Sequence, residues 1–263
     1  MDSEKKFAVL IDAENIPPKY IRIIFDEITN KGVATYKRIY GNWTDPNLAS
    51  WKNVLLEYSI TPMQQYNYTS GKNSSDSALI IDAMDILYAG NVDGFCIVSS
   101  DSDFTKLASR LRESAKTVIG MGETKTPSPF VKACEEFKFL DKLIDAEKPE
   151  SEKPAAKNPD TNKPEKSKPQ PAKKERDSQT GRKDIEKAIV KIVRDSKDEE
   201  GWILISDIGT KLPKLYPDFD VRNFGHKKML PFLESFGKFE FKKVRDPANK
   251  TNPNGFTVYF KLK

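Results

Sequence analysis

The stretch FCIVSSDSDF, residues 95–104, places two aspartates shortly after an apolar run. Its first four residues have the composition of a buried strand, and a helical pattern begins at its last phenylalanine. In open α/β sheets, ligands bind in the crevice at the carboxyl ends of the strands, so Asp101 and Asp103 are candidate site residues. Asp101 or Ser102 could instead cap the helix, and this is the simpler interpretation of the stretch taken alone.

On both sides of this stretch, apolar runs alternate with helical patterns. Strands are expected near residues 7–11, 33–40, 60–65, 95–98 and 117–121, and helices near residues 21–28, 48–58, 73–88 and 104–115. Such alternation predicts a mostly parallel sheet with helices on both faces. The carboxyl ends of its strands would then lie along one edge.

Two more aspartates fall where this fold would gather them. Asp12 closes the first strand, and Asp76 lies in the first turn of a helix that follows a strand end. Each could be a loop or capping residue, but with Asp101 and Asp103 they predict a site for a hard divalent cation, which prefers carboxylate oxygens. Such an ion activates water for attack on a phosphodiester. Asp82, a turn and a half further along, should face elsewhere and is interpreted as a structural pairing residue.

Composition divides the 263-residue chain into three parts. Residues 147–181 contain no Val, Ile, Leu, Met or aromatic residue and are rich in Pro, Lys and Glu, which predicts a disordered linker between domains at 1–146 and 182–263. The three parts carry net charges of −3, +2 and +6. The basic third part fits contact with an anionic polymer, although a charge of this size is also normal for a soluble surface.

Several classes of protein are disfavoured by residue usage. Two cysteines, Cys96 and Cys134, do not make a disulfide framework. The single histidine, His226, lies outside the first domain, so chemistry there would rely on carboxylates. The sequence has no signal-peptide pattern and no run of apolar residues long enough to span a membrane, so we expect a cytoplasmic protein without membrane contact.

The third part of the chain has the pattern of a small winged-helix domain. Helices are expected from residue 184, over 206–212 and over 221–235, and strands over 239–244 and 256–261. Pro231 would kink the last helix or mark an internal start. Three helices with a two-stranded wing suit contact with nucleic acid, and helix-turn-helix geometry leaves DNA open as the ligand.

Several motifs of the first domain resemble the NYN family, which belongs to the PIN-like nuclease superfamily. They are LIDAEN at 10–15, RIYGNW at 38–43, GKNSSD at 71–76, LIIDAMD at 79–85 and SSDSDF at 99–104. The resemblance implies a PIN-like α/β fold that hydrolyses RNA with Mg²⁺ or Mn²⁺. Asp12, Asp76, Asp101 and Asp103 match its metal-binding and catalytic acids, and Asn15 matches a polar neighbour that steadies the site. Asp82 falls on a position that is commonly acidic in this family.

The third part resembles the OST-HTH/LOTUS domain in Gly201-Trp202, in Phe224-Gly225 before a basic helix, and in its closing strands. That resemblance implies binding to RNA or to a protein partner. Expected substrate contacts lie beside the motifs of the first domain and on the basic face of the second. They are Arg38, Tyr40, Lys72, Arg222, Lys227 and Lys228.

Together these features predict a metal-dependent ribonuclease that acts on single-stranded RNA and carries a linked RNA-binding domain. Two alternatives stay open. One is a non-catalytic regulator that binds RNA or protein through the same domains, and the other is a nuclease directed at DNA.

Overall fold

The computed structural model of the chain describes residues 4–66, 74–147, 180–195, 201–245 and 256–263. The predicted linker lies outside the described residues except at its two ends, as does Lys72. The first domain consists of β1 (Lys6–Asp12), η1 (Pro18–Tyr20), α1 (Ile21–Thr29), β2 (Val33–Gly41), η2 (Pro46–Trp51), α2 (Lys52–Leu55), β3 (Thr61–Gln64), α3 (Ser74–Ala89), β4 (Gly94–Val98), η3 (Ser102–Phe104), α4 (Thr105–Glu113), β5 (Thr117–Gly122), α5 (Ser128–Ala133), β6 (Glu136–Phe139) and α6 (Leu140–Glu147).

These strands form one six-stranded sheet in the order β3-β2-β1-β4-β5-β6, and every neighbouring pair is parallel. The predicted fold class is therefore confirmed. The chain builds outward from β1 through β2 to β3, and then returns to the other side of β1 with β4. The strand order thus reverses between β1 and β4, which is where open α/β sheets bind their ligands.

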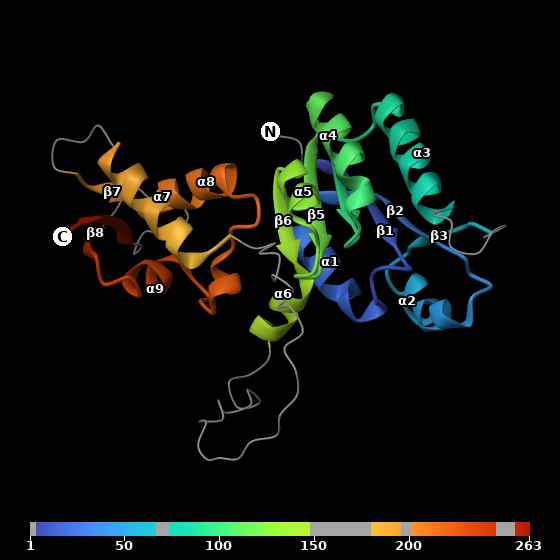
Figure 1. Ribbon diagram of the computed structural model, residues 1–263, viewed down its shortest axis with the longest axis horizontal. Helices are drawn as coiled ribbons and strands as arrows, with labels where there is room; N and C mark the ends of the chain where they lie inside the picture. Colours follow the sequence, from blue (N-terminus) through green and yellow to red (C-terminus); the bar gives the residue numbers. More distant parts are fainter. Residues whose placement is uncertain (1–3, 67–73, 148–179, 196–200, 246–255) are drawn as a thin grey trace, which may run out of the picture.

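Helices cover both faces of the sheet (Figure 1). The central strands β1, β4 and β5 are buried at almost every position, as strands covered on both faces require. In β1, Val9 and Ile11 pack toward α1, η2 and α6. Ala8 and Leu10 pack toward α3, α4 and α5. The two helical layers fix the positions from which loops emerge at the carboxyl edge.

The sequence interpretation was wrong in several local details. The helix expected over 48–58 begins as a 3₁₀ turn, η2, and continues only as the short α2. The segment from 123 to 147 holds α5, β6 and α6, and of these β6 and α6 were not predicted. Their apolar residues are short runs between polar ones, which leaves little periodicity to detect.

The second domain contains α7 (Arg182–Arg194), β7 (Ile203–Leu204), α8 (Ile205–Leu215), η5 (Val221–Phe224), α9 (Met229–Glu234), β8 (Phe239–Arg245) and β9 (Phe256–Leu262). Strands β7, β9 and β8 form an antiparallel sheet whose inner face packs on the helices around Ile189, Phe232 and Phe260. This is the predicted arrangement of helices with a small sheet.

The helix expected over 221–235 is divided in two. Gly225 adopts a left-handed conformation with φ of 79°, which ends η5 before α9 starts at Met229. Pro231 lies in the first turn of α9, where the missing amide hydrogen costs little. The interpretation of Pro231 as the mark of an internal helix start is therefore correct.

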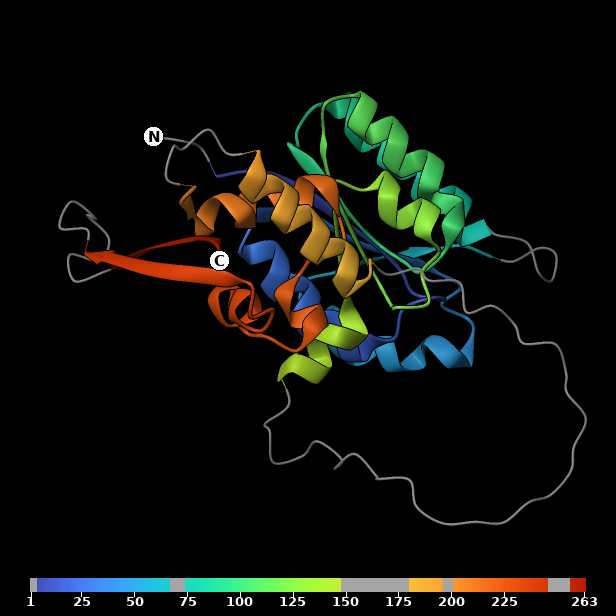
Figure 2. The ribbon, with the colours of Figure 1, turned by 60° about the vertical axis from the view of Figure 1, so that its left-hand side comes forward.

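The second domain contacts the free edge of the six-stranded sheet. The Phe137 amide of the edge strand β6 donates to the Pro217 carbonyl oxygen at 2.7 Å. Beside it, Lys138 and Asp220 form an ion pair at 2.8 Å. Figure 2 shows α7 to α9 lying against the side of the first domain that carries α1 and α6. Over the described part of the chain, none of the helices has the length and apolar character needed to cross a membrane.

Candidate metal centre at the carboxyl edge of the sheet

Three aspartates meet at the carboxyl edge of the sheet. Asp76, Asp101 and Asp103 each offer a carboxylate oxygen, and these oxygens lie within 4.8 Å of one another. Asp76 comes from the first turn of α3 and is only 8% exposed. Asp101 follows β4, and Asp103 lies in η3 with an exposed side chain. Residues 25 positions apart in the sequence are thus brought together by the fold.

Asp101 also caps the helical segment that follows it. Its Oδ1 accepts the Asp103 backbone amide hydrogen at 2.9 Å, with Asp101 itself in an extended conformation. This is ordinary N-cap geometry, in which a side-chain oxygen satisfies an amide at the start of a helix. The capping interpretation of the FCIVSSDSDF stretch is therefore correct for Asp101, which also belongs to the three-aspartate group.

Asp12 lies beside this group rather than within it. It is 1% exposed, and its Oδ1 accepts the backbone amides of Glu14 and Asn15 at 3.1 and 3.3 Å. Its Oδ2 accepts the Asn15 side-chain amide at 2.7 Å and the Ser99 hydroxyl at 2.8 Å. Asn15 thus steadies Asp12, as expected. Four donors on its two oxygens thus hold the Asp12 carboxyl group in place next to the three-aspartate group.

Ser99 connects the two parts of the site and was not singled out from the sequence. Its hydroxyl donates to Asp12 and accepts the Asp101 amide at 3.0 Å, so it ties the ends of β1 and β4 together. Glycine is required opposite it, because a Cβ at Gly122 would lie 2.6 Å from the Ser99 carbonyl oxygen. The available signal was a serine immediately after a buried strand, two residues before Asp101.

The carboxylates destabilise one another's charged forms. Burial, together with the negative charges of Asp12 and Asp101, raises the pKa of Asp76 to about 7. Burial also raises the pKa of Asp12, and the hydrogen bonds from Ser99 and Asn15 offset part of that rise. A bound cation would relieve this repulsion. Three clustered carboxylate oxygens are the donors that Mg²⁺ and Mn²⁺ prefer, so the residues present fit such an ion.

Asp82 belongs to a different cluster, further along α3. Its carboxylate pairs with Arg38 of β2 and accepts the hydroxyl hydrogen of Tyr40. Tyr40 is 1% exposed. Asp82 thus engages Arg38 and Tyr40, two of the side chains that were expected to touch substrate. The geometry agrees with the interpretation of Asp82 as a structural pairing residue.

The expected substrate residues of the second domain are divided. Lys227 and Lys228 are exposed just before α9. Arg222, in contrast, donates to both oxygens of Glu27 at 2.7 and 3.1 Å and also pairs with Asp220 at 2.7 Å. Its guanidinium therefore joins the two domains.

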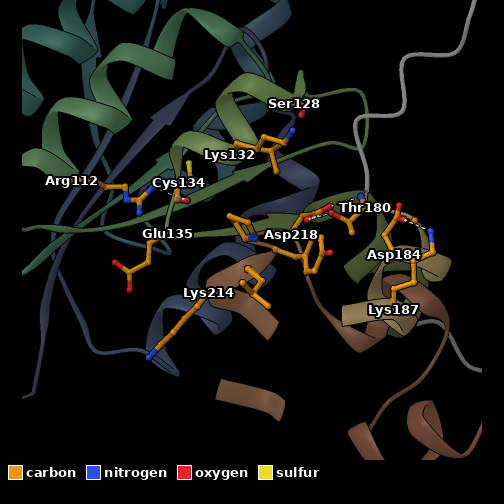
Figure 3. Close-up of a pocket in the computed structure, with 15 residues that line it drawn as sticks. Arg112, Ser128, Lys132, Cys134, Glu135, Thr180, Asp184, Lys187, Lys214 and Asp218 are labelled. Carbon is orange, nitrogen blue, oxygen red and sulfur yellow. Dashed lines mark hydrogen bonds and ion pairs between the residues drawn. The ribbon is translucent and has the colours of Figure 1, made fainter. Parts of the chain in front are cut away.

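A large cleft lies away from the aspartates, between the domains. It has a volume of about 860 Å³ and is lined by residues that include Arg112, Lys132, Lys214 and Asp218 (Figure 3). Asp218 is already bonded to the amide and hydroxyl of Thr180 at 2.8 and 2.7 Å. None of the three clustered aspartates lines this cleft, so its size does not make it the chemical site.

Comparison with known proteins agrees with the fold and with the motifs. The family profile of the NYN domain matches residues 6–141, and that of the OST-HTH/LOTUS domain matches residues 181–251. A search of curated proteins finds no match. Among solved structures, a protein of unknown function from Vibrio parahaemolyticus is similar at 21% identity with a TM-score of 0.44, covering 52% of this chain and 93% of its own. An NYN domain indicates a PIN-like nuclease, and an OST-HTH domain indicates RNA binding. The chain belongs to the NYN family and carries a C-terminal OST-HTH/LOTUS domain.

Proposed function

We propose that this protein is a divalent-cation-dependent ribonuclease that hydrolyses single-stranded RNA. The observation that carries the proposal is the group formed by Asp76, Asp101 and Asp103, whose carboxylate oxygens approach within 4.8 Å at the edge of an NYN-type sheet. Like charges at such short range around the buried Asp76 are costly in a fold without a cation to balance them. The OST-HTH domain supports RNA as the substrate class.

In the proposed mechanism, Asp76, Asp101 and Asp103 supply the oxygens that hold Mg²⁺ or Mn²⁺. When bound, such an ion lowers the pKa of water and neutralises the charge that builds on a phosphodiester during hydrolysis. Asp12 contributes a fourth negative charge nearby. It also keeps Asp101 in place, because both residues bond to the Ser99 hydroxyl.

The second domain would hold RNA close to the acidic edge. Lys227 and Lys228, exposed before α9, are proposed to contact phosphates. Arg38, Tyr40 and Arg222 are proposed to stabilise the fold rather than to contact RNA, since their side chains already bond to carboxylates of the protein.

Cleavage assays with an end-labelled single-stranded RNA, the same RNA as a duplex, and the matching single-stranded DNA test this proposal in Mn²⁺, Mg²⁺ or EDTA. Asp101→Asn is the informative variant because asparagine also caps helices well, so the fold should be retained. Asp85→Asn is the matched control, since Asp85 is an exposed acid of α3 outside the acidic group.

We expect ion-dependent cleavage of single-stranded RNA by the wild-type and Asp85→Asn proteins, and cleavage about 100-fold slower by Asp101→Asn. Faster cleavage of DNA than of RNA would favour a DNA-directed nuclease. No cleavage of any substrate would favour a regulator that binds without catalysis.

A further inference from the structure

The turn that leads into the last helix of the second domain contacts the first domain. In a helix-turn-helix the start of the last helix reads the groove, and here Lys227 and Lys228 just before α9 are exposed. Here the preceding turn, η5, carries Arg222, which donates two hydrogen bonds to Glu27 of α1. Asp220 at the start of η5 pairs with Lys138 of β6 at 2.8 Å.

This contact neutralises the charges that would otherwise attract phosphate. Glu27 and Asp220 are each 9% exposed, and both accept hydrogen bonds from the Arg222 guanidinium. Burial of a paired cation leaves little positive potential on the surface. The face of the docked domain most distant from this contact is its sheet, as the positions of β7 and β8 in Figure 1 show.

The sheet β7-β9-β8 has an inner apolar face and an outer face of different character. Phe241 and Phe260 pair across β8 and β9, and Phe260 is fully buried with Ile203 of β7 beside it. Side chains alternate along a strand, so the neighbours of these residues point outward. Those neighbours include Lys242 on β8, Tyr259 and Lys261 on β9, and Trp202 immediately before β7.

On this outer face, two ammonium groups lie against one aromatic ring. The Nζ atom of Lys261 is 4.6 Å from the centre of the Trp202 ring, and that of Lys242 is 5.8 Å away. Glu240 lies 3.4 Å from Lys261 and balances one of the two charges. A net positive charge remains next to two aromatic side chains, Trp202 and Tyr259.

A single nucleic-acid strand matches this combination, because its bases stack on aromatic rings while its phosphates pair with nearby cations. A base arriving at Trp202 would bring phosphates to the two ammonium groups, which would exchange the ring for the stronger charge pair. A duplex keeps its base faces stacked inside the helix and can offer only phosphates.

We propose that the outer face of the β7-β9-β8 sheet, centred on Trp202, Lys242, Lys261 and Tyr259, is the surface on which this protein binds unpaired RNA bases. The turn η5 serves to dock the domain on β6 and α1. This inference rests on the proposed function for its choice of RNA, and it adds the residues that would hold the strand.

The test measures how tightly a fluorescein-labelled ten-nucleotide oligouridine binds to the full chain. Fluorescence anisotropy reports the binding, in EDTA and at several salt concentrations. EDTA removes divalent ions, so the result does not depend on cleavage. The informative proteins are Trp202→Ala and the double variant Lys242→Gln/Lys261→Gln. The matched control is Lys183→Gln/Lys191→Gln, which removes the same charge from exposed positions of α7.

We expect Trp202→Ala to weaken binding about 10-fold or more, as loss of a stacking surface does. The double lysine variant should weaken binding and lower the slope of log affinity against log salt by about 1.4. The control pair should change affinity by less than about 3-fold, since both of its lysines lie on α7, outside the proposed sheet face.

The proposal is overturned if the control pair weakens binding more than both sheet variants, or if Trp202→Ala binds like the wild-type protein. The lysine variant guards against a folding artefact, because both substituted side chains lie on the surface and its melting temperature can be compared with that of the control. Failure of the proposed nuclease would show separately, as absence of cleavage in Mn²⁺ by a protein that still binds the oligouridine.

Discussion

Replacing Asp76 with asparagine should make the protein more stable and less able to bind a cation. The pKa of Asp76 is about 7 in the folded protein, compared with an ordinary value of 3.8. The folded state therefore holds this proton more tightly than the unfolded state. The stabilisation is complete below pH 3.8 and is lost as the pH rises through 7, so at pH 8 the ionised carboxylate opposes folding.

The shift from 3.8 to about 7 would correspond to roughly 4 kcal/mol at pH 8 if it were expressed fully. Solvent and salt near the edge of the sheet screen the repulsion, so we expect about 2 kcal/mol. In EDTA at pH 8, Asp76→Asn should thus raise the free energy of unfolding by about 2 kcal/mol, and its advantage should shrink toward zero near pH 4.

Divalent ions should reverse this order. An ion held at 100 times its dissociation constant stabilises the folded wild-type protein by about 2.7 kcal/mol, and the variant lacks one of the ligands. Urea unfolding followed by circular dichroism at pH 4 and pH 8, in EDTA or Mn²⁺, measures each quantity. Asp85→Asn is the control, because it removes an exposed acid from the same helix. The reasoning fails if Asp76→Asn is no more stable than the wild-type protein in EDTA at pH 8, or if Mn²⁺ stabilises both equally.

Three other substitutions separate structural from chemical roles. Ser99→Ala should cost about 2 kcal/mol of stability, because it removes a hydrogen-bond donor from the buried Asp12 and an acceptor from the Asp101 amide. It should also slow RNA cleavage. Urea unfolding measures the first effect, and cleavage assays measure the second. Arg38→Gln should lower the free energy of unfolding by about 1 kcal/mol through loss of its ion pair with a partly buried carboxylate, with no change in RNA affinity. Arg222→Gln should lower the free energy of unfolding by about 2 kcal/mol, because it removes the ion pairs with Glu27 and Asp220. It should also speed hydrogen exchange at the Phe137 amide of β6, which bonds to the second domain. Mass spectrometry measures this exchange.

Each of these variants has a surface counterpart that should be near neutral. Ser102→Ala alters an exposed serine, and Lys52→Gln and Lys227→Gln each remove one exposed positive charge. A control as destabilising as its test variant would count against the named contact. If Arg38→Gln or Arg222→Gln weakened RNA binding without loss of stability, those arginines would be substrate ligands as the sequence first suggested.

The fold and the acidic group could largely be predicted because they follow from local patterns. Apolar runs mark buried strands, and parallel strands place their carboxyl ends along one edge. Asp76 and Asp101 could therefore be assigned to the same edge before the structure was known. Asp12 was assigned to the correct edge as well, but its complete set of donors, including Ser99, was not visible in the sequence.

The partners of charged side chains were much harder to predict. Nothing local to Arg38 or Arg222 indicates that each bonds to a carboxylate distant in sequence, Asp82 and Glu27 respectively. A basic residue beside a motif has the same sequence signature whether it binds phosphate or closes an ion pair within the protein. The contact between the two domains was not predicted, for a related reason. It depends on β6, a strand of four residues, which is too short to show a clear pattern of apolar and polar residues.

The claim that the acidic group holds a cation for hydrolysis is tested most directly by the products of RNA cleavage in Mn²⁺. Attack by water leaves linear phosphate and hydroxyl ends, whereas attack by the neighbouring 2′-hydroxyl leaves a cyclic phosphate, and mass spectrometry distinguishes the two. We expect linear ends from the wild-type protein and a cleavage rate about 100-fold lower for Asp101→Asn. Cyclic ends, or cleavage at the wild-type rate by Asp101→Asn, would contradict the assignment of Asp76, Asp101 and Asp103 as the metal centre of a hydrolase.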